Sequence, residues 1–205
     1  MRLAIGGPTR DTVPASFALD LAQLYAHTRE RGPWGSMVTV GFLTATYIHM
    51  GREYFLEASM LQGATHVLWL DTDMSFPPET AIRLALHEQP IVACNYLTRD
   101  GTGRFTAKRD GQRIATTAES TGLEAVDSVG FGVLLMRVDA ALKVSRPRFR
   151  HGLNATEGDI GEDHMFCRAL RAAGHDIFID HDVSKEIGHI GQHTYRTTTQ
   201  VALTV

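Results

Sequence analysis

A short apolar run that ends in two aspartates constrains the fold of this chain more than any other feature. The run from His66 to Leu70 is apolar after its first residue, and Asp71 and Asp73 follow it directly. An uninterrupted apolar strand is typical of a parallel sheet that is covered on both faces. Ligands of such sheets bind beyond the carboxyl ends of the strands, where the two aspartates would lie. The run therefore predicts an α/β fold with a binding site at that edge.

Strand and helix patterns alternate through the first half of the chain. Apolar residues recur at helical spacing in three segments, and short apolar runs separate them. We predict helices over 14–32, 46–62 and 77–86, and strands over 3–5, 37–40, 66–70 and 91–94. Gly6, Gly7 and Pro8 are expected to end the first strand. This order predicts a mainly parallel sheet flanked by helices.

The second half of the chain differs from the first in composition and in its predicted elements. Residues 99–127 are polar and rich in glycine and threonine, which predicts loops and short antiparallel strands. A buried strand is expected over 133–136, a helix over 162–173 and a strand over 177–179. The polar tail from residue 192 is expected to be loosely held.

Composition excludes several classes of protein. Hydrophobic residues make up 43% and charged residues 21%, close to globular averages, which argues against a disordered, collagen-like or coiled-coil chain. The net charge of −3 argues against a generally polybasic protein. Cys94 and Cys167 stand in apolar contexts without a CxxC partner, so we expect reduced core thiols. No apolar stretch approaches a membrane span or a signal peptide, so we expect a soluble, cytoplasmic protein without a transmembrane segment.

The aspartates that follow the apolar strand suit a divalent cation. Asp71 and Asp73 are two residues apart, so both carboxylates can turn toward one ligand. Mg²⁺ and Mn²⁺ need oxygen ligands and commonly keep substrate phosphates among them. A solvated turn, in which the acids and Ser75 cap the next helix, would explain the same residues. From this tripeptide alone both interpretations stay open.

Two later segments carry further candidate groups. Glu162 and Asp163 stand at the expected start of a helix, where capping would explain them. A general base that takes a proton from an attacking hydroxyl is the functional alternative. His189 stands between two glycines and could complete a metal shell begun by the aspartates, with His193 as a second candidate. A lone histidine is also often structural, so this assignment stays open as well.

The order and spacing of these segments resemble a known family. They are similar to a GT-A glycosyltransferase of the inverting family-two type, including its small soluble members from phages. Arg52 matches an arginine that many such enzymes place in the helix before the aspartate strand. The resemblance runs from about residue 3 to residue 191. It rests on Asp71-Thr72-Asp73, Phe76-Pro77-Pro78, Asn95-Tyr96 with Arg99, Val129-Gly130-Phe131-Gly132, Gly161-Glu162-Asp163 and Gly188-His189-Ile190-Gly191.

The resemblance implies both an architecture and a donor. The fold would be GT-A, a Rossmann-like nucleotide-diphospho-sugar transferase, with a mainly parallel sheet flanked by helices and a small antiparallel portion. A single domain over 1–205 would comprise a nucleotide-sugar-binding half at 1–97, an acceptor and catalytic half at 98–191, and a tail at 192–205. The donor would be a nucleoside-diphosphate sugar, with a UDP-sugar as the first expectation.

The resemblance also implies roles for single residues. Asp73 would bind Mn²⁺ or Mg²⁺ directly, His189 would be a further metal ligand, and Asp71 would contact the ribose or reach the metal through water. Asp163 would deprotonate the acceptor hydroxyl as it attacks the anomeric carbon, with Glu162 beside it, and the configuration would invert. Retaining GT-A enzymes share the metal site, so the stereochemical outcome stays open. The expected nucleotide-sugar site also contains Pro8, Thr9, Arg52 and Tyr96.

The acceptor side is expected to carry basic residues. The segments 99–113 and 146–151 hold Arg99, Arg104, Lys108, Arg109, Arg113, Arg146, Arg148 and Arg150 against Asp100 and Asp110. Solvated loops would explain this charge. An anionic acceptor, such as a lipid-phosphate-linked sugar or a hydroxymethylated DNA base, is the functional alternative beside a neutral glycan. The residues expected on this side are Gly130, Phe131, Arg148 and Arg150.

Two other functions remain open. In a haloacid-dehalogenase-type phosphatase Asp71 would be the nucleophile, Asp73 the acid and base, and Lys143 the phosphate partner, with a late acidic motif at 158–163. Two strands precede Asp71, and the segment 152–157 before the late motif is not apolar, which argues against this interpretation. A non-catalytic nucleotide or glycan binder would require the acids to be idle.

Overall fold

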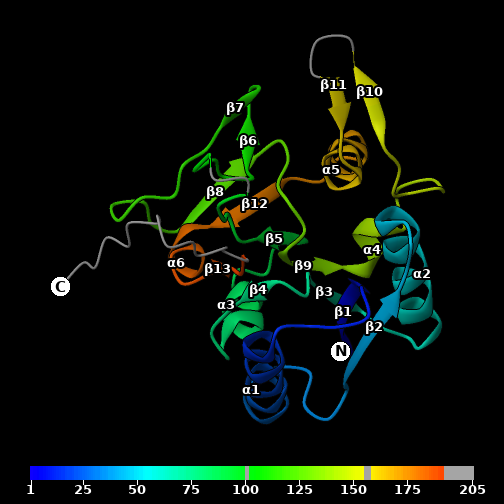
Figure 1. Cartoon of the computed structure of the whole chain (residues 1–205). Coiled ribbons are helices and arrows are strands. Elements are labelled where there is room, and N and C mark those ends of the chain that lie inside the picture. Colours follow the sequence, from blue (N-terminus) through cyan, green and yellow to red (C-terminus); the bar gives the residue numbers. More distant parts are fainter. Residues whose placement is uncertain (100–101, 155–157, 192–205) are drawn as a thin grey trace, which may run out of the picture.

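A seven-stranded sheet with helices on both faces organises the chain (Figure 1). The computed structural model describes residues 1–99, 102–154 and 158–191; Asp100, His193 and the tail from residue 192 lie outside them. The first elements are β1 (Leu3–Thr9), α1 (Ala15–Arg31), β2 (Val38–Thr44), α2 (Ile48–Leu61), β3 (His66–Leu70), β4 (Met74–Ser75), α3 (Thr80–Leu86) and β5 (Ile91–Ala93). Then follow β6 (Lys108–Arg109), β7 (Gln112–Arg113), β8 (Leu123–Val126), β9 (Val133–Arg137), α4 (Val138–Ala141), β10 (Gly152–Asn154), β11 (Gly158–Ile160), α5 (Glu162–Ala172), β12 (Ile177–Asp180), α6 (His181–Ser184) and β13 (Gly188–His189).

The strand order of the main sheet is β2-β1-β3-β9-β5-β12-β8. Strand β9 runs antiparallel to both of its neighbours, and β8 runs antiparallel to β12. The other strands share one direction. The predicted α/β architecture, a mainly parallel sheet flanked by helices with a smaller antiparallel portion, is confirmed. The division of the chain into two functional halves stays a prediction.

The alternation of side chains along β3 divides the core into two layers. Val67 and Trp69 pack with α2 and α5, whereas Leu68 and Leu70 pack with α1 and α3. All four side chains have no exposed surface. This arrangement explains why the run is uninterrupted, because both faces of a strand in the middle of a covered sheet are buried.

The first strand is longer than the sequence suggested. The prediction that Gly6, Gly7 and Pro8 end the strand was wrong, because β1 continues through them to Thr9 in parallel register with β2. Gly6 has a φ of 150°, and a Cβ there would lie 1.7 Å from the carbonyl oxygen of Gly41. Glycine therefore permits the close approach of β2 instead of breaking the strand.

Several elements were not predicted because they are too short to show a period. They include β4, β13, α4 and α6, none of which exceeds four residues. The predicted helices and strands of the first half otherwise match the structure to within a few residues. Both cysteines are buried and free, as expected for core thiols. No helix in the described part of the chain is long and apolar enough to cross a membrane.

The chain adds its second and third strands on opposite sides of β1. Its neighbours are β2 on one side and β3 on the other, and the connecting helices α1 and α2 cover opposite faces. The parallel neighbours β1 and β3 have their carboxyl ends at the same edge of the sheet, which is the edge where open α/β sheets bind ligands. Thr9 ends β1, and Asp71 follows β3, so both stand at this edge.

The close approach at Gly6 makes a prediction about stability. Gly6→Ala should lower the free energy of unfolding by roughly 2 kcal/mol or more, because the new Cβ forces β1 away from β2. The measurement is urea unfolding followed by circular dichroism. Gly41→Ala is the matched control, since its Cβ would meet only a ring carbon of Phe55, at 3.7 Å. Equal losses in the two variants would contradict this account.

Candidate active site

Arg52 of α2 ties three elements together at the carboxyl edge of the sheet. Its side chain is buried, with 1% of its surface exposed. Nε donates to Oε1 of Glu162 over 3.0 Å, and Nη2 donates to Oδ1 of Asp71 over 2.9 Å. The rings of Trp69 and Phe131 lie 5.7 and 5.5 Å from its Cζ, close enough for cation–π attraction. Arg52 thus fixes the end of β3 against the start of α5.

The contacts of Arg52 bear on its predicted role near the nucleotide. Burial alone would lower the pKa of the guanidinium, but Asp71 and Glu162 outweigh burial and raise that pKa, so the group stays charged. Its Nη1 is buried and finds no hydrogen-bond acceptor among the described residues. Direct contact with a nucleotide stays a prediction, whereas the positioning of the two carboxylates is observed.

Asp73 lies in the tight turn that follows β3. The turn is held by the backbone N–H of Asp71, which donates to the carbonyl of Gly132, and by that of Met74, which donates to the carbonyl of Asp71. Oδ2 of Asp73 lies 2.8 Å from Nη2 of Arg99, and Oδ1 lies 3.7 Å from Nε2 of His189. The structure therefore brings Asp73 and His189 together, as predicted.

Short backbone pairing places His189 at this position. Strand β13 pairs antiparallel with β4, so that His189 stands opposite Met74, and the N–H of Ile190 donates to the carbonyl of Asp73 over 2.7 Å. Nδ1 of His189 lies 2.8 Å from the carbonyl oxygen of Leu97. A carbonyl only accepts, so Nδ1 carries a proton and Nε2 is the ring nitrogen that faces Asp73. Burial lowers the pKa of His189, but Asp73 and the Leu97 carbonyl outweigh it and raise that pKa. With Nδ1 held by the carbonyl, Nε2 is the nitrogen that would bind a metal ion in the neutral ring.

The donor set fits a cation that is completed by its substrate. Within residues 1–99, 102–154 and 158–191, no three His, Cys, Asp or Glu side chains gather as a metal site. The 3.7 Å between the donor atoms of Asp73 and His189 can be spanned by a cation about 2.1 Å from each. Since Mg²⁺ commonly binds through one or two carboxylates plus phosphates, this pair fits a cation that arrives with a nucleotide. Burial raises the pKa of Asp73, but His189 and Arg99 outweigh it and hold that pKa below its usual value.

Arg99 is a contact of the site that sequence reasoning assigned elsewhere. The sequence placed it in the basic acceptor loops, whereas its guanidinium binds Asp73 and also donates to the carbonyl of Ile190 over 3.3 Å. Its position in the sequence could have indicated this contact, because Arg99 lies in the loop just after β5, and β5 ends at the same edge of the sheet as β3. Arg99 is half-exposed, so it can move without disturbing the core.

The two acids at the start of α5 have different surroundings. Glu162 is buried and bound to Arg52, whereas Asp163 is partly exposed and accepts a hydrogen bond from the N–H of His164. A Cβ on Gly161 would come within 2.8 Å of Oδ1 of Asp163, so the glycine gives that carboxylate room. Glu162 is therefore a positioning group, and Asp163 is the one of the two that is open to solvent.

Tyr96 packs beneath the carboxylates. Its hydroxyl accepts a hydrogen bond from the N–H of Gly132 over 2.9 Å, and its ring meets the His189 ring edge-on at 5.3 Å. Burial raises its pKa well above the ordinary value, and the charges of Asp71 and Asp163 add to the rise. Both aspartates therefore lie near this hydroxyl.

Gly130 and Phe131, expected on the acceptor side, lie under the site. A Cβ on Gly130 would stand 2.5 Å from the Tyr96 hydroxyl, so the residue must be small. Phe131 is fully buried and packs against Trp69, Phe149 and Phe166. These residues form the floor of the site and offer no side chain to solvent.

The basic residues of the segment 146–151 are largely neutralised. Arg148 is buried, and its Nη1 and backbone N–H bind the carboxylate of Glu53 over 2.6 and 2.7 Å. Arg146 is paired with Glu53 and Glu57 of the same helix. Arg148 is therefore buried against Glu53 and is not an exposed acceptor contact, contrary to expectation, whereas Arg146 and Arg150 are exposed.

Basic residues do lie within electrostatic range of His164, the neighbour of Asp163 in α5. Burial lowers the pKa of His164, and the charges of Lys108, Arg113 and Arg168 lower it further, against the attraction of Asp163. These three cations thus lie close enough to the first turn of α5 to act on it. They come from the β6–β7 hairpin and from α5 itself.

A hollow of about 700 Å³ adjoins the carboxyl ends of β1 and β2. Thr9, predicted to contact the nucleotide, stands on its rim, whereas Pro8 is buried. The hollow lies against α1 and is lined by Thr9, Arg10, Asp11, Val13, Phe17, Ala18, Leu21, Ala22, Tyr25, Val40, Phe42 and Thr44. Its aromatic walls and polar rim have the character of a small-molecule subsite.

The position of Lys143, the phosphate partner in the phosphatase interpretation, argues against that interpretation. Because β9 runs antiparallel to β3, Arg137 pairs with His66 at the amino end of β3. Lys143 comes six positions later, just after α4, and is exposed. It therefore lies at the edge of the sheet opposite Asp71 and cannot neutralise a phosphoryl group there.

Comparison with known proteins supports the fold. No protein-family model matches the chain, and no curated protein matches it in sequence. The crystal structure of A197 from STIV has a TM-score of 0.61 at 15% identity, covering 98% of this chain and 100% of that chain. A nucleoside-diphosphate-sugar pyrophosphorylase from Vibrio cholerae RC9 has a TM-score of 0.47 at 14% identity, covering 90% of this chain and 75% of that chain. At such identity the likeness to A197 concerns the fold alone.

The buried pairs of Arg52 predict a large effect on stability. Arg52→Met should lower the free energy of unfolding by about 3 kcal/mol or more, because it leaves two carboxylates without their cation. Adding Glu162→Gln should recover part of the loss by removing the more deeply buried charge. Arg29→Met is the control, an exposed arginine over the Tyr25 ring, and should cost less than about 1 kcal/mol in chemical denaturation. Similar losses for both arginines would refute the central role of Arg52.

Proposed function

We propose that the chain is a glycosyltransferase that uses Mn²⁺ or Mg²⁺ to move a sugar from a nucleoside-diphosphate sugar to an acceptor hydroxyl. The observation that carries the proposal is the meeting, at one sheet edge, of the Asp73–His189 pair with the open carboxylate of Asp163. The fold shared with A197 is compatible with this function and does not identify it. The proposal rests on the chemistry of the edge itself.

The charge balance of the edge favours a cation. Around Arg52 and Arg99 stand three carboxylates, those of Asp71, Asp73 and Glu162, so one negative charge is in excess there. Burial raises the pKa of Asp71, and repulsion from Asp73 and Asp163 adds to the rise despite Arg52. A divalent cation held by Asp73 and His189 would offset this excess, and when bound it neutralises charge on the departing nucleoside diphosphate.

The nucleoside is expected in the hollow beside β1 and β2. Thr9 stands on its rim, and Phe42 and Tyr25 line its wall. Asp11 also lines the hollow and could accept a hydrogen bond from a base N–H. A uracil base offers such a donor, so a UDP-sugar is the first donor to test.

Asp163 serves as the base in this proposal. It accepts the proton of the acceptor hydroxyl while the hydroxyl oxygen bonds to the anomeric carbon. The bond from that carbon to the donor phosphate breaks on the opposite face, and its electron pair leaves with the nucleoside diphosphate. Glu162 and Asp71 are bound to Arg52, so they hold the end of β3 against the start of α5 and do not compete for this proton. Inversion follows from the direction of attack, and a retained product would require a different mechanism.

The acceptor is proposed to be anionic. Lys108, Arg113 and Arg168 act on the first turn of α5, where the acceptor must approach Asp163. A lipid-phosphate-linked sugar or a hydroxymethylated DNA base would match this charge, whereas a neutral glycan would not need it. Binding of a nucleic acid would weaken steeply with added salt.

The metal pair gives the first functional prediction. Asp73→Asn should weaken Mn²⁺-dependent binding of UDP at least about tenfold, because the cation loses its charged ligand. Isothermal titration with and without Mn²⁺ measures this. Asp176→Asn, at an exposed aspartate before β12, is the control and should bind as the parent does. Equal UDP binding without any divalent cation would remove the donor site as proposed.

The partly exposed carboxylate of Asp163 in α5 gives the second functional prediction. Asp163→Asn should keep UDP and Mn²⁺ binding within about twofold and slow sugar transfer roughly 10²- to 10⁴-fold, the usual contribution of a general base. Transfer is measured from labelled UDP-sugars to separate pools of glycan, lipid phosphate and hydroxymethylated DNA. Asp159→Asn, at an exposed aspartate in β11, is the control. Full activity of the Asp163 variant would mean that another group takes the proton.

A further inference from the structure

Strand β2 forms one edge of the main sheet and lacks the features that protect such an edge. It spans seven residues, with neither a charged residue nor a proline among them. Natural sheets protect their edges with short strands, charges, prolines or a covering element. The other edge, β8, follows this rule, because it has four residues and its Glu124 is paired with Arg109 of β6. Of the two edges, β2 is therefore the one that can accept a further strand.

The open side of β2 carries unpaired backbone groups. At one end of its ladder with β1 the N–H of Leu3 donates to the carbonyl of Met37, and at the other end the N–H of Ala45 donates to the carbonyl of Thr9. Every second residue of a parallel strand bonds to a given neighbour, so the odd-numbered residues of β2 face β1. No described strand lies on the other side of β2. The N–H and C=O groups that point to that side belong to Val38, Val40, Phe42 and Thr44.

Helix α2, which packs on β1 and β2, is uncharged along its exposed side. The solvent-facing side of a helix normally carries its charged residues. The three charged residues of α2, Arg52, Glu53 and Glu57, are instead paired with other parts of the chain. The exposed side carries residues that recur at helical spacing from the N-cap onward and that we call the α2 stripe: Tyr47, Met50, Tyr54, Ala58 and Leu61.

The α2 stripe faces the open edge of β2. Arg52 reaches toward the middle of the sheet, to the ring of Trp69 in β3. Phe55 lies over β1 and β2, because its ring is the neighbour that a Cβ on Gly6 or Gly41 would meet. Successive residues of a helix are rotated by about 100°, so the direction from Arg52 through Phe55 continues to the stripe on the outer side. Figure 1 shows β2 and α2 together at one side of the molecule, and the stripe and the open edge thus form one surface.

We propose that this surface binds a second copy of the chain. Antiparallel pairing of β2 with its copy, about a two-fold axis normal to the sheet, would join the outward N–H and C=O groups of both strands. Pairing centred on Gly41, the middle residue of β2, uses all four outward residues of each copy. The same axis places the two α2 stripes against each other on one face of the joined sheet. One partner satisfies both features, and such an isologous contact closes at two copies.

The exposed area is of the size that a dimer needs. Within the α2 stripe the exposed fractions reach 53% for Tyr54, 61% for Tyr47 and 90% for Leu61. With the edge strand the stripe exposes on the order of 600 Å², against roughly 800 Å² that each partner loses in a standard interface. Interfaces are enriched in tyrosine and methionine and poor in charged residues at their centres, as this surface is. A single added strand would leave the stripe uncovered, whereas a second copy covers both.

Sedimentation velocity of the full chain tests the oligomeric state. We expect the chain to be mostly dimeric at about 100 µM, because interfaces of this size bind with micromolar or tighter affinity. Tyr54→Lys places two like charges in the contact and should weaken dimerisation about tenfold or more. Leu153→Lys adds the same charge at an exposed leucine of β10 and is the matched control, which should dimerise as the parent does.

Val40→Pro tests the contribution of the edge strand. It removes an N–H that points away from β1, so no bond within the sheet is lost, and proline is tolerated on the open side of an edge strand. Dimerisation should again weaken about tenfold or more in a variant that circular dichroism shows to be folded. If Val40→Pro does not fold, Tyr54→Lys decides.

Three results would overturn the proposal. The first is a chain that stays monomeric at about 100 µM, including one whose Tyr54 variant loses binding to phosphatidylcholine vesicles, which would mean that a membrane covers the stripe. The second is a dimer that neither variant weakens. The third is a dimer that Leu153→Lys weakens as much as Tyr54→Lys does.

Discussion

The buried guanidinium of Arg52 is the constraint on which the carboxylate edge depends. A charge removed from water is tolerated only where partners compensate it, and here Asp71, Glu162 and two aromatic rings do so. Those partners belong to the end of β3, the start of α5 and the loop before β9. Their relative positions are thereby fixed, and so is the distance between the turn that carries Asp73 and the helix that carries Asp163.

This arrangement gives four neighbouring carboxylates different surroundings. Asp71 and Glu162 are bound to Arg52, Asp73 faces Arg99 and His189, and Asp163 stays open at the first turn of α5. Four identical acids in one polar environment would only repel one another. In the proposed function these differences in pairing and burial would give Asp71 and Glu162 a positioning role, Asp73 a cation-binding role and Asp163 a proton-accepting role, as environment does for carboxylates in many active sites.

The sequence allowed the main elements to be predicted, because each carries a clear period or an uninterrupted apolar run. It also indicated that Asp73 and His189 share a site. It could not show that Gly6 continues a strand, because the reason is the carbonyl of Gly41 in a neighbouring strand. Nor could it show that Arg148 is buried, because the compensating carboxylate belongs to Glu53 in a distant helix. Two-residue strands such as β4 and β13 are too short to show a period, yet their pairing places His189 next to Asp73.

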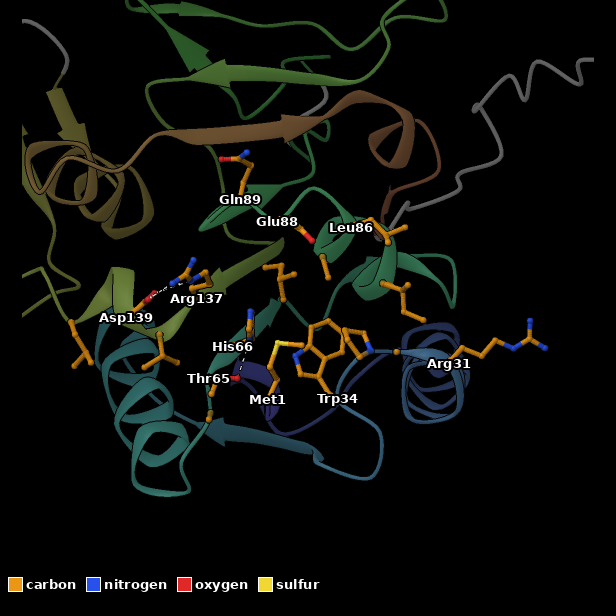
Figure 2. A pocket seen from close by; sticks show the side chains of 18 residues that line it. Met1, Arg31, Trp34, Thr65, His66, Leu86, Glu88, Gln89, Arg137 and Asp139 are labelled. Carbon is orange, nitrogen blue, oxygen red and sulfur yellow. Dashed lines mark hydrogen bonds and ion pairs between the residues drawn. The ribbon is translucent and has the colours of Figure 1, made fainter.

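The two ends of β3 present opposite chemistry. Its carboxyl end leads into four neighbouring carboxylates, whereas its amino end at His66 borders a cavity with a mostly apolar lining (Figure 2). Between these ends the side chains from Val67 to Leu70 are apolar and fully buried. The strand therefore offers no polar side chain along that stretch, so the chemistry of each end is set by the elements that surround it and not by the strand itself.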